Sequence, residues 1–151
     1  MVSVQVSHAL VIDDEFNNRD FAEKLLQKAG LQVCSAASGA EALALVATLP
    51  HNTLVLIDHE LPDTTGVQLI KKIHEISPDM MLVMATMHDH TQLIDEAFEA
   101  GVHMFLIKPN GFIELYRALL SGDNTILSRE NRYIVDNYGP RKYKGAKKPV
   151  C

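Results

Sequence analysis

Residues 8–15 read HALVIDDE, an apolar run that ends abruptly at three acids. This pattern predicts a buried β-strand that delivers Asp13 and Asp14 at its carboxyl end. Four further short apolar segments follow along the chain: residues 31–36, 53–57, 80–85 and 104–107. A segment with apolar residues at helical spacing follows each of these five apolar runs: residues 17–29, 38–49, 67–76, 89–100 and 112–120. The sequence therefore predicts five strands that alternate with five helices.

Local signals mark where several of the predicted helices begin and end. Ser38 followed by Glu41 forms a capping box, and Pro50 prevents that helix from continuing. Gly30 and Gly101 stand where glycine commonly ends a helix. Short buried strands that alternate with helices favour a parallel sheet with helices on both faces, and right-handed crossovers leave few topologies. We therefore expect an α/β fold with a doubly wound, five-stranded parallel sheet.

Length and composition indicate one globular domain with an appendage. The chain has 151 residues, of which 47% are hydrophobic and 22% charged, values typical of a folded domain. No apolar run approaches the roughly 18 residues that span a bilayer, and the first residues lack the pattern of a secretory signal. We therefore expect a cytoplasmic protein without a membrane partner. Cys34 lies in an apolar segment and is expected in the core.

The distribution of charge divides the chain. Residues 1–128 contain 7 Lys and Arg against 17 Asp and Glu, whereas residues 129–151 contain 7 against 2. The body is therefore near −10 and the tail near +5, which marks a boundary. We place a domain at residues 1–121 and a C-terminal extension at residues 122–151.

The C-terminal extension is predicted to contain a short helix followed by a basic tail. Between residues 125 and 138 the apolar side chains can share one helical face: Ile126, Tyr133, Ile134 and Tyr138. Gly139 and Pro140 would end this helix, and the sequence RKYKGAKKPVC after them has little apolar surface to bury. We expect this end to dock onto acidic partners or neighbouring subunits. The extension is too short for a helix-turn-helix domain with its own core, so specific nucleic-acid binding is not expected.

Polar side chains follow four of the predicted strands at their carboxyl ends. They are Asp13 and Asp14 after the first strand, Asp58 after the third, Thr86 after the fourth and Lys108 after the fifth. In an open α/β sheet this edge is where ligands bind. Three converging carboxylates need a cation between them, and oxygen ligands favour a hard ion such as Mg²⁺. An ammonium and a hydroxyl group suit the oxygens of a phosphoryl group, so the central Asp58 is the predicted nucleophile.

Four motifs occur in order at these strand ends: VIDDE at residues 11–15, DHELPDTTG at 58–66, MAT at 84–86 and FLIKP at 105–109. Together they resemble the receiver domains of two-component response regulators, over residues 8–121. The resemblance implies a flavodoxin-like sheet with strand order 2-1-3-4-5. It also implies Mg²⁺ as the cofactor, held by Asp13, Asp14, Asp58 and the backbone carbonyl of Glu60.

The same resemblance implies individual roles for the site residues. Asp58 is the phosphoacceptor, and Lys108 is the partner of its phosphoryl group. Thr86 is the switch hydroxyl that moves toward the phosphoryl group, and Phe105 is the aromatic side chain that turns inward behind it. The Lys108-Pro109 bond is implied to be cis, a form that X-Pro bonds tolerate. Met87 departs from the small residue usual at its position, and its bulk is expected to hinder small donors or the hydrolytic water.

The resemblance implies a phosphorelay switch rather than an enzyme. A sensor histidine kinase or a histidine phosphotransfer protein would donate the phosphoryl group, slow self-dephosphorylation would remove it, and the change of shape would control a partner. In this family the fourth and fifth helices often form phosphorylation-dependent homodimers. The side chains expected on that face are Ile94, Phe98, Ile113 and Tyr116.

The sequence leaves two alternatives to this interpretation: a phosphohydrolase and a histidine metal site. A phosphohydrolase with an Asp nucleophile also uses Mg²⁺ on an α/β sheet, but such enzymes resemble a D-x-D pattern, and position 60 here is Glu. His59, His88 and His90 lie near the strand ends and invite a transition-metal site, but the sequence does not reveal the ligand spacing that such sites need.

Overall fold

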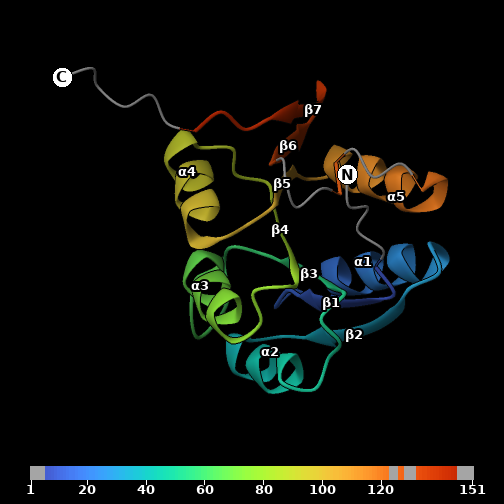
Figure 1. The fold of residues 1–151 in the computed structure, drawn as a ribbon, viewed down its shortest axis with the longest axis vertical. Helices are drawn as coiled ribbons and strands as arrows, with labels where there is room; N and C mark the ends of the chain where they lie inside the picture. The colour runs from blue at the N-terminus through green and yellow to red at the C-terminus, as the bar shows by residue number, and fades with distance from the viewer. Residues whose placement is uncertain (1–5, 123–125, 128–131, 146–151) are drawn as a thin grey trace.

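The computed structural model describes residues 6–122, 126–127 and 132–145. Within these residues, seven strands form one sheet and five helices cover its two faces (Figure 1). The strands are β1 (His8–Ile12), β2 (Gln32–Ala36), β3 (Thr53–Ile57), β4 (Met81–Thr86), β5 (Met104–Ile107), β6 (Tyr133–Asp136) and β7 (Gly139–Lys142). The helices are α1 (Phe16–Lys28), α2 (Gly39–Val46), α3 (Gly66–Ile76), α4 (Thr91–Ala100) and α5 (Asn110–Ser121). In this described part of the chain, none of the helices is long and apolar enough to cross a membrane.

The strand order is β2-β1-β3-β4-β5-β6-β7. The strands from β1 to β5 run parallel, and β6 continues the parallel arrangement beside β5. β7 is antiparallel to β6 and forms the outer edge. The predicted order 2-1-3-4-5 is thus confirmed for the first five strands, and the C-terminal extension adds two more.

The register of the central strands aligns their carboxyl ends. β1 and β3 pair up to their last residues, so Asp13 and Asp58 follow at the same level. β4 and β5 pair up to Thr86 and Ile107, and Lys108 is the next residue. The fold therefore brings the predicted site residues to one edge of the sheet.

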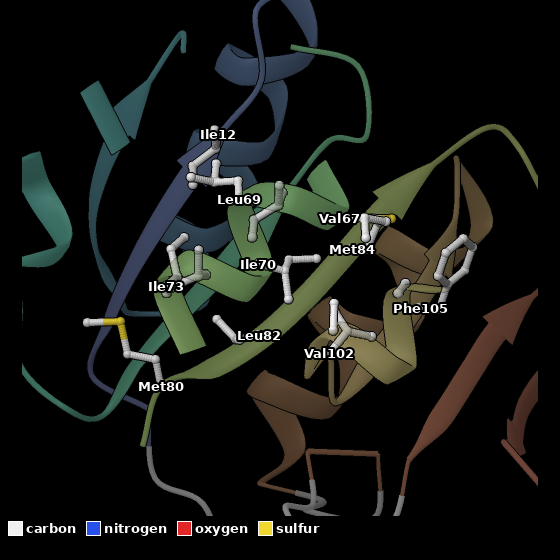
Figure 2. Close-up of a cluster of buried hydrophobic side chains, with 14 of the residues drawn as sticks. Ile12, Val67, Leu69, Ile70, Ile73, Met80, Leu82, Met84, Val102 and Phe105 are labelled. Carbon is white, nitrogen blue, oxygen red and sulfur yellow. The ribbon is translucent and has the colours of Figure 1, made fainter. Parts of the chain in front are cut away.

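A hydrophobic core fills the space on each face of the sheet. α2, α3 and α4 pack against one face, and Figure 2 shows part of this core around α3 and β4. α1 and α5 pack against the other face. All residues of β3 and β4 are buried, because helices cover both faces of these central strands. This double coverage explains why their sequences are continuously apolar and do not alternate.

Local interactions support the predicted helix limits. Ser38 Oγ accepts a hydrogen bond from Glu41 N at 3.2 Å at the start of α2. The Glu41 carboxylate accepts a hydrogen bond from Ala37 N at 2.9 Å. The reciprocal bond of the capping box is therefore made to the residue before Ser38 rather than to Ser38 itself. α4 ends at Gly101, whose φ of 121° lies in the region that favours glycine. The cap of α2 and the end of α4 are therefore confirmed.

The prediction of a C-terminal helix is wrong, although part of its range lies outside the described residues. The described part forms β6 and β7 instead. Tyr133 and Val135 pack into the core beside α5 and Ile134 into the opposite core, an alternation with the period of a strand. β-branched Ile134 and Val135 favour a strand, and β5 would otherwise leave an unpaired sheet edge. Gly139 does not end a helix, because at φ 89° it begins the return strand.

The β6–β7 hairpin (residues 133–142) lies between α4 and α5 (Figure 1). In its turn, Asp136 Oδ1 accepts a hydrogen bond from Tyr138 N at 2.9 Å, and the Asp136 carboxylate pairs with Arg141. The side chain of the next residue, Asn137, accepts a hydrogen bond from Asn110 at the start of α5. The hairpin is therefore fixed both internally and against α5.

The hairpin lies beside the surface of the fourth and fifth helices on which the sequence predicts four exposed side chains. Ile94 and Phe98 of α4 are buried, whereas Ile113 of α5 is exposed. Tyr116 lines a groove between α1 and α5. The four side chains therefore do not form one exposed surface.

The other edge of the sheet explains a second correction. Cys34 is exposed rather than buried in the core. It lies on β2, which is the edge strand beside β1 and is covered less completely than β3 and β4. An apolar segment on an edge strand is therefore a weaker sign of burial than one in the centre.

Candidate functional site

Asp13 directly follows β1 and is held in a buried position, with 5% of its surface exposed. Its Oδ1 accepts a hydrogen bond from Glu15 N at 3.0 Å, and its Oδ2 accepts one from Lys108 Nζ at 3.2 Å. Arg19 Nη1 donates to the Asp13 backbone carbonyl at 2.8 Å, an interaction that the sequence did not predict. Both carboxylate oxygens of Asp13 are therefore oriented before any ligand binds.

Asp58 lies beside Asp13 at the end of β3. Lys108 Nζ is 3.6 Å from Asp58 Oδ1, so the same ammonium group pairs with the carboxylates of both Asp13 and Asp58. Carboxylate oxygens of Asp13, Asp14 and Asp58 lie within 4.8 Å of one another. Asp13 is buried, Asp58 is half-buried and Asp14 is exposed, so the group opens toward solvent. The predicted acids and Lys108 therefore form one pocket with more negative than positive charge.

The surroundings of Asp58 raise its pKa above the ordinary value of 3.8. Burial is the largest cause, because it disfavours the charged form. Lys108 opposes this effect, and the neighbouring Asp13 carboxylate adds to it. The protein alone therefore compensates the charge of Asp58 incompletely, which is the condition under which a bound cation stabilises a carboxylate.

Thr86 and Lys108 stand at the carboxyl ends of the next two strands, β4 and β5. Thr86 is buried, and its Oγ1 accepts a hydrogen bond from His88 N at 3.2 Å, which leaves its hydroxyl proton for another acceptor. Lys108 N donates to the Thr86 carbonyl at 2.9 Å, so the two residues are tied through the backbone. The Lys108-Pro109 bond is cis, as predicted. Lys108 therefore reaches the acids directly, and Thr86 ends the strand beside β3 at the same edge of the sheet.

Phe105 is fully buried in the core that α3 and α4 cover (Figure 2). It pairs with Met84 of β4 on one side and with Ile134 of β6 on the other. The C-terminal extension therefore contributes to the surroundings of Phe105. The switch movement of this ring stays a prediction.

The remaining candidates lie at the rim of the pocket. Glu60 is exposed, and its carboxylate lies 3.4 Å from His88 Nε2, while its backbone carbonyl stays a predicted ligand. The rings of His88 and His90 stack with their centroids 6.0 Å apart. Among the residues described, however, the aspartate set is the one group of three or more potential metal ligands whose atoms converge. This arrangement does not favour a histidine metal site.

Two residues outside the predicted set shape the loop after β3. The Asp63 carboxylate accepts hydrogen bonds from Gly39 N at 2.8 Å and Ala40 N at 2.9 Å, and these donors lower its pKa. The loop is thereby tied to the start of α2. A Cβ on Gly66 would lie 2.7 Å from the Asp58 carbonyl oxygen, so α3 begins this close to the site only with glycine. Both residues lie in the DTTG stretch at residues 63–66, but nothing in that stretch predicts the contact with α2.

The geometry agrees with comparisons to known proteins. Residues 9–120 match the family described as the response regulator receiver domain. The chain is 28% identical over 110 residues to Sporulation initiation phosphotransferase F of Bacillus subtilis, which covers 73% of this chain and 88% of that protein. It resembles a two-component response regulator from Clostridium difficile with a TM-score of 0.71 and 26% identity, covering 83% of this chain and 98% of the other. It also resembles the beryllofluoride-activated NtrC4 receiver domain dimer, with a TM-score of 0.65 and 27% identity, covering 76% and 97%.

The match over most of the chain and the acidic pocket lead to the same assignment. The pocket of Asp13, Asp14 and Asp58 is typical of the phosphorylation site of such domains and is consistent with their metal site. The chain belongs to the response regulator receiver domain family, the phosphoaccepting domains of two-component systems, which are signalling switches rather than catalytic enzymes.

Proposed function

We propose that Asp58 accepts a phosphoryl group and that the chain passes this event to a partner by changing shape. The observation that carries the proposal is the placement of the Asp58 carboxylate, 3.6 Å from Lys108 Nζ and within 4.8 Å of two further carboxylates. Asp58 is less enclosed than Asp13 and sits at the end of a central strand. It therefore combines access for a donor with a fixed position.

The transfer needs little chemistry beyond positioning and charge compensation. A carboxylate oxygen of Asp58 forms a bond to phosphorus while the P–N bond of a phosphohistidine donor breaks, and the released imidazole nitrogen takes up a proton. Lys108 offsets the negative charge of the phosphoryl oxygens, and the Thr86 hydroxyl donates a hydrogen bond to one of them. Both residues thereby favour the phosphorylated form.

We propose Mg²⁺ as the cation of this site. The donor set fits it, because all candidate ligands are oxygens and the three carboxylates outweigh the single ammonium group. Asp13, Asp14 and Asp58 would hold the ion, with the backbone carbonyl of Glu60 as a further ligand. When bound, Mg²⁺ supplies the positive charge that the phosphoryl oxygens require.

The proposed donor is a sensor histidine kinase or a histidine phosphotransfer protein. Two large aromatic side chains of α1, the helix that begins two residues after Asp14, are exposed: Phe16 with 66% and Phe21 with 53% of its surface accessible. Phe21 also lines the groove between α1 and α5, together with Leu25 and Tyr116. Exposed apolar surface next to a reactive site favours protein docking. This surface therefore supports a protein donor rather than only a small phosphate ester.

We further propose that residues 1–121 form the receiver unit and that residues 122–151 are an extension docked on it. The family match ends at residue 120, close to the change in charge. Any phosphorylation-dependent homodimer through the side of α4 and α5 would have to include the β6–β7 hairpin.

The test is phosphorylation of the full chain by a small phosphoryl donor, followed by intact mass measurement. We expect a single phosphoryl addition with Mg²⁺, no addition with a chelator, and no addition in Asp58→Asn. Glu75→Gln, which removes an exposed carboxylate outside the site, is the matched control and should behave like the unmodified chain. Mg²⁺-dependent phosphorylation that persists in Asp58→Asn would refute the assignment.

A further inference from the structure

The β6–β7 hairpin extends the sheet beyond β5 and touches the helices on both sides. β6 pairs in parallel with β5, and its residues enter both hydrophobic cores. A Cβ on Gly111, at the start of α5, would lie 3.1 Å from the Val135 carbonyl oxygen, so the helix rests directly on β6. The hairpin is therefore a packed part of the domain and not a loose appendage.

One side chain next to the hairpin makes two contacts with α4. Tyr143, directly after β7, donates a hydrogen bond from Oη to Asp95 Oδ1 at 2.6 Å. Its ring stacks on that of Phe98, with centroids 4.0 Å apart and planes inclined by 12°. Arg132, just before β6, donates to the Phe98 backbone carbonyl at 3.3 Å. We call the contacts of Tyr143 with Asp95 and Phe98 the Tyr143 latch.

The same helix is connected to the phosphorylation site at its other end. The segment from Thr86 to the first residue of α4 is short, and Thr86 Oγ1 accepts a hydrogen bond from His88 N within it. If the Thr86 side chain moves so that its hydroxyl reaches a phosphoryl group on Asp58, Oγ1 is displaced relative to its hydrogen-bond donor, His88 N. The segment leading into α4 must then rearrange, and Asp95 lies in the second turn of that helix.

We propose that the Tyr143 latch holds the hairpin against α4 in the unphosphorylated protein and that phosphorylation of Asp58 loosens it. This inference rests on the proposed function of Asp58. A shift of α4 by about 1 Å would stretch the Tyr143–Asp95 hydrogen bond beyond its effective range. A hydrogen bond to a carboxylate contributes about tenfold or more to an equilibrium, so its loss changes the open fraction of the hairpin measurably.

The coupling must also act in reverse, because linkage between two sites is reciprocal. If a group at Asp58 favours the open hairpin, then weakening the latch must favour binding of that group. A variant that opens the hairpin without touching the acidic pocket should therefore bind a phosphoryl mimic more tightly.

Trypsin offers a direct readout, since Arg141 and Lys142 lie within β7 and Tyr143 follows them. Cleavage after either residue requires the hairpin to leave the sheet locally. We would measure the cleavage rate of the full chain at these two bonds by mass spectrometry, with Mg²⁺ and with or without beryllofluoride. Three proteins would be compared: the unmodified chain, Tyr143→Phe, and Tyr138→Phe as the matched control. Tyr138 lies in the same hairpin and its side chain is 95% exposed.

We expect beryllofluoride to raise the cleavage rate of the unmodified chain about tenfold. Tyr143→Phe keeps the stacked ring and loses the hydroxyl donor, so it should be cleaved about tenfold faster without beryllofluoride and should bind beryllofluoride more tightly. Tyr138→Phe should match the unmodified chain in both measurements.

The outcomes separate the two proposals. If beryllofluoride does not bind in an Asp58-dependent manner, the proposed function fails and the latch fails with it. If it binds but leaves the cleavage rate unchanged, the latch alone is refuted. If Tyr143→Phe is cleaved no faster than Tyr138→Phe, the hydroxyl contact with Asp95 does not hold the hairpin and the inference is overturned.

Discussion

Replacing Asp58 by Asn should stabilise the metal-free protein, although it removes the proposed phosphoacceptor. At an effective dielectric constant near 20, repulsion from a carboxylate oxygen of Asp13 within 4.8 Å is at least about 3.5 kcal/mol, and attraction to Lys108 at 3.6 Å is about 4.6 kcal/mol. The repulsion and the attraction nearly cancel. The charge of Asp14 contributes little because this residue is exposed and solvent screens it. The burial of Asp58 then decides whether its charge stabilises or destabilises the folded protein. The raised pKa of Asp58 agrees with a destabilising charge. We expect Asp58→Asn to gain on the order of 1–2 kcal/mol, because an incompletely compensated buried charge is removed.

The pH dependence of this gain has a definite sign. The pKa of Asp58 is raised in the folded protein, so ionisation of Asp58 costs stability as the pH rises from 3.8 through the folded pKa. The difference between the two proteins should therefore be largest at neutral pH and should shrink as the pH falls toward 3.8. Mg²⁺ should reverse the ranking, because a ligand at 100 times its Kd adds about 2.7 kcal/mol and Asp58→Asn lacks one of the three carboxylates.

The assay is thermal or urea unfolding at neutral pH, with a chelator and then with Mg²⁺. A gain of about 1–2 kcal/mol corresponds to a rise in Tm of roughly 2–8 °C for a domain of this size. Glu75→Gln serves again as the control and should change neither measurement. A lower Tm for Asp58→Asn in the chelator, or equal stabilisation of both proteins by Mg²⁺, would show that the charge balance derived for the pocket is wrong.

Four other changes test separate parts of the structure. Thr86→Ala should still be phosphorylated but switch incompletely, because it loses a charge-assisted hydrogen bond of roughly 1.5–3 kcal/mol; a full phosphorylation-dependent rise in tryptic cleavage of β7 would contradict this. Gly66→Ala should lower stability by about 1–3 kcal/mol in urea unfolding, since its Cβ would lie 2.7 Å from a carbonyl oxygen; an unchanged midpoint would show that α3 moves without cost. Asp63→Ala should lower the Tm at neutral pH and match the unmodified chain in acid, because a lowered pKa gives stability that is lost as the pH falls through it; a difference that persists in acid would rule out the carboxylate as the cause. Met87→Ala should shorten the lifetime of the phosphorylated protein if the exposed thioether shields it from water, as a decay assay by intact mass would show; an unchanged lifetime would remove Met87 from this role.

Much of the fold was predictable because the central strands carry their information locally. β3 and β4 are largely apolar, Asp58 directly follows β3 and Thr86 ends β4, so both their burial and their carboxyl ends could be placed from the sequence. The pocket was predictable for a related reason, since parallel strands present their carboxyl ends at one edge of the sheet. Asp13 and Lys108 are far apart in the chain, yet both were predicted because each ends a strand.

The C-terminal extension was mispredicted because its short apolar segment fits two periods. Tyr133 and Ile134 could be assigned to a helical face, but the period of a strand also accommodates them. The open edge of β5 decides between the two, and this edge is a property of the assembled sheet. The Asp63 contact with α2 was missed for a similar reason, because its donors lie 23 and 24 residues earlier in the chain. Interactions of this kind have no local sequence signal.

The position of β7 has a consequence for self-association. It is the outermost strand beyond β6, and Pro140, Arg141 and Lys142 are exposed along it. Proline lacks a backbone donor, and neighbouring positive charges repel a second copy, so this edge resists strand addition. Loosening of the hairpin would uncover the edge of β5, which has no such protection in its sequence MFLI. In the folded domain the hairpin therefore covers an apolar strand edge and replaces it with a charged one.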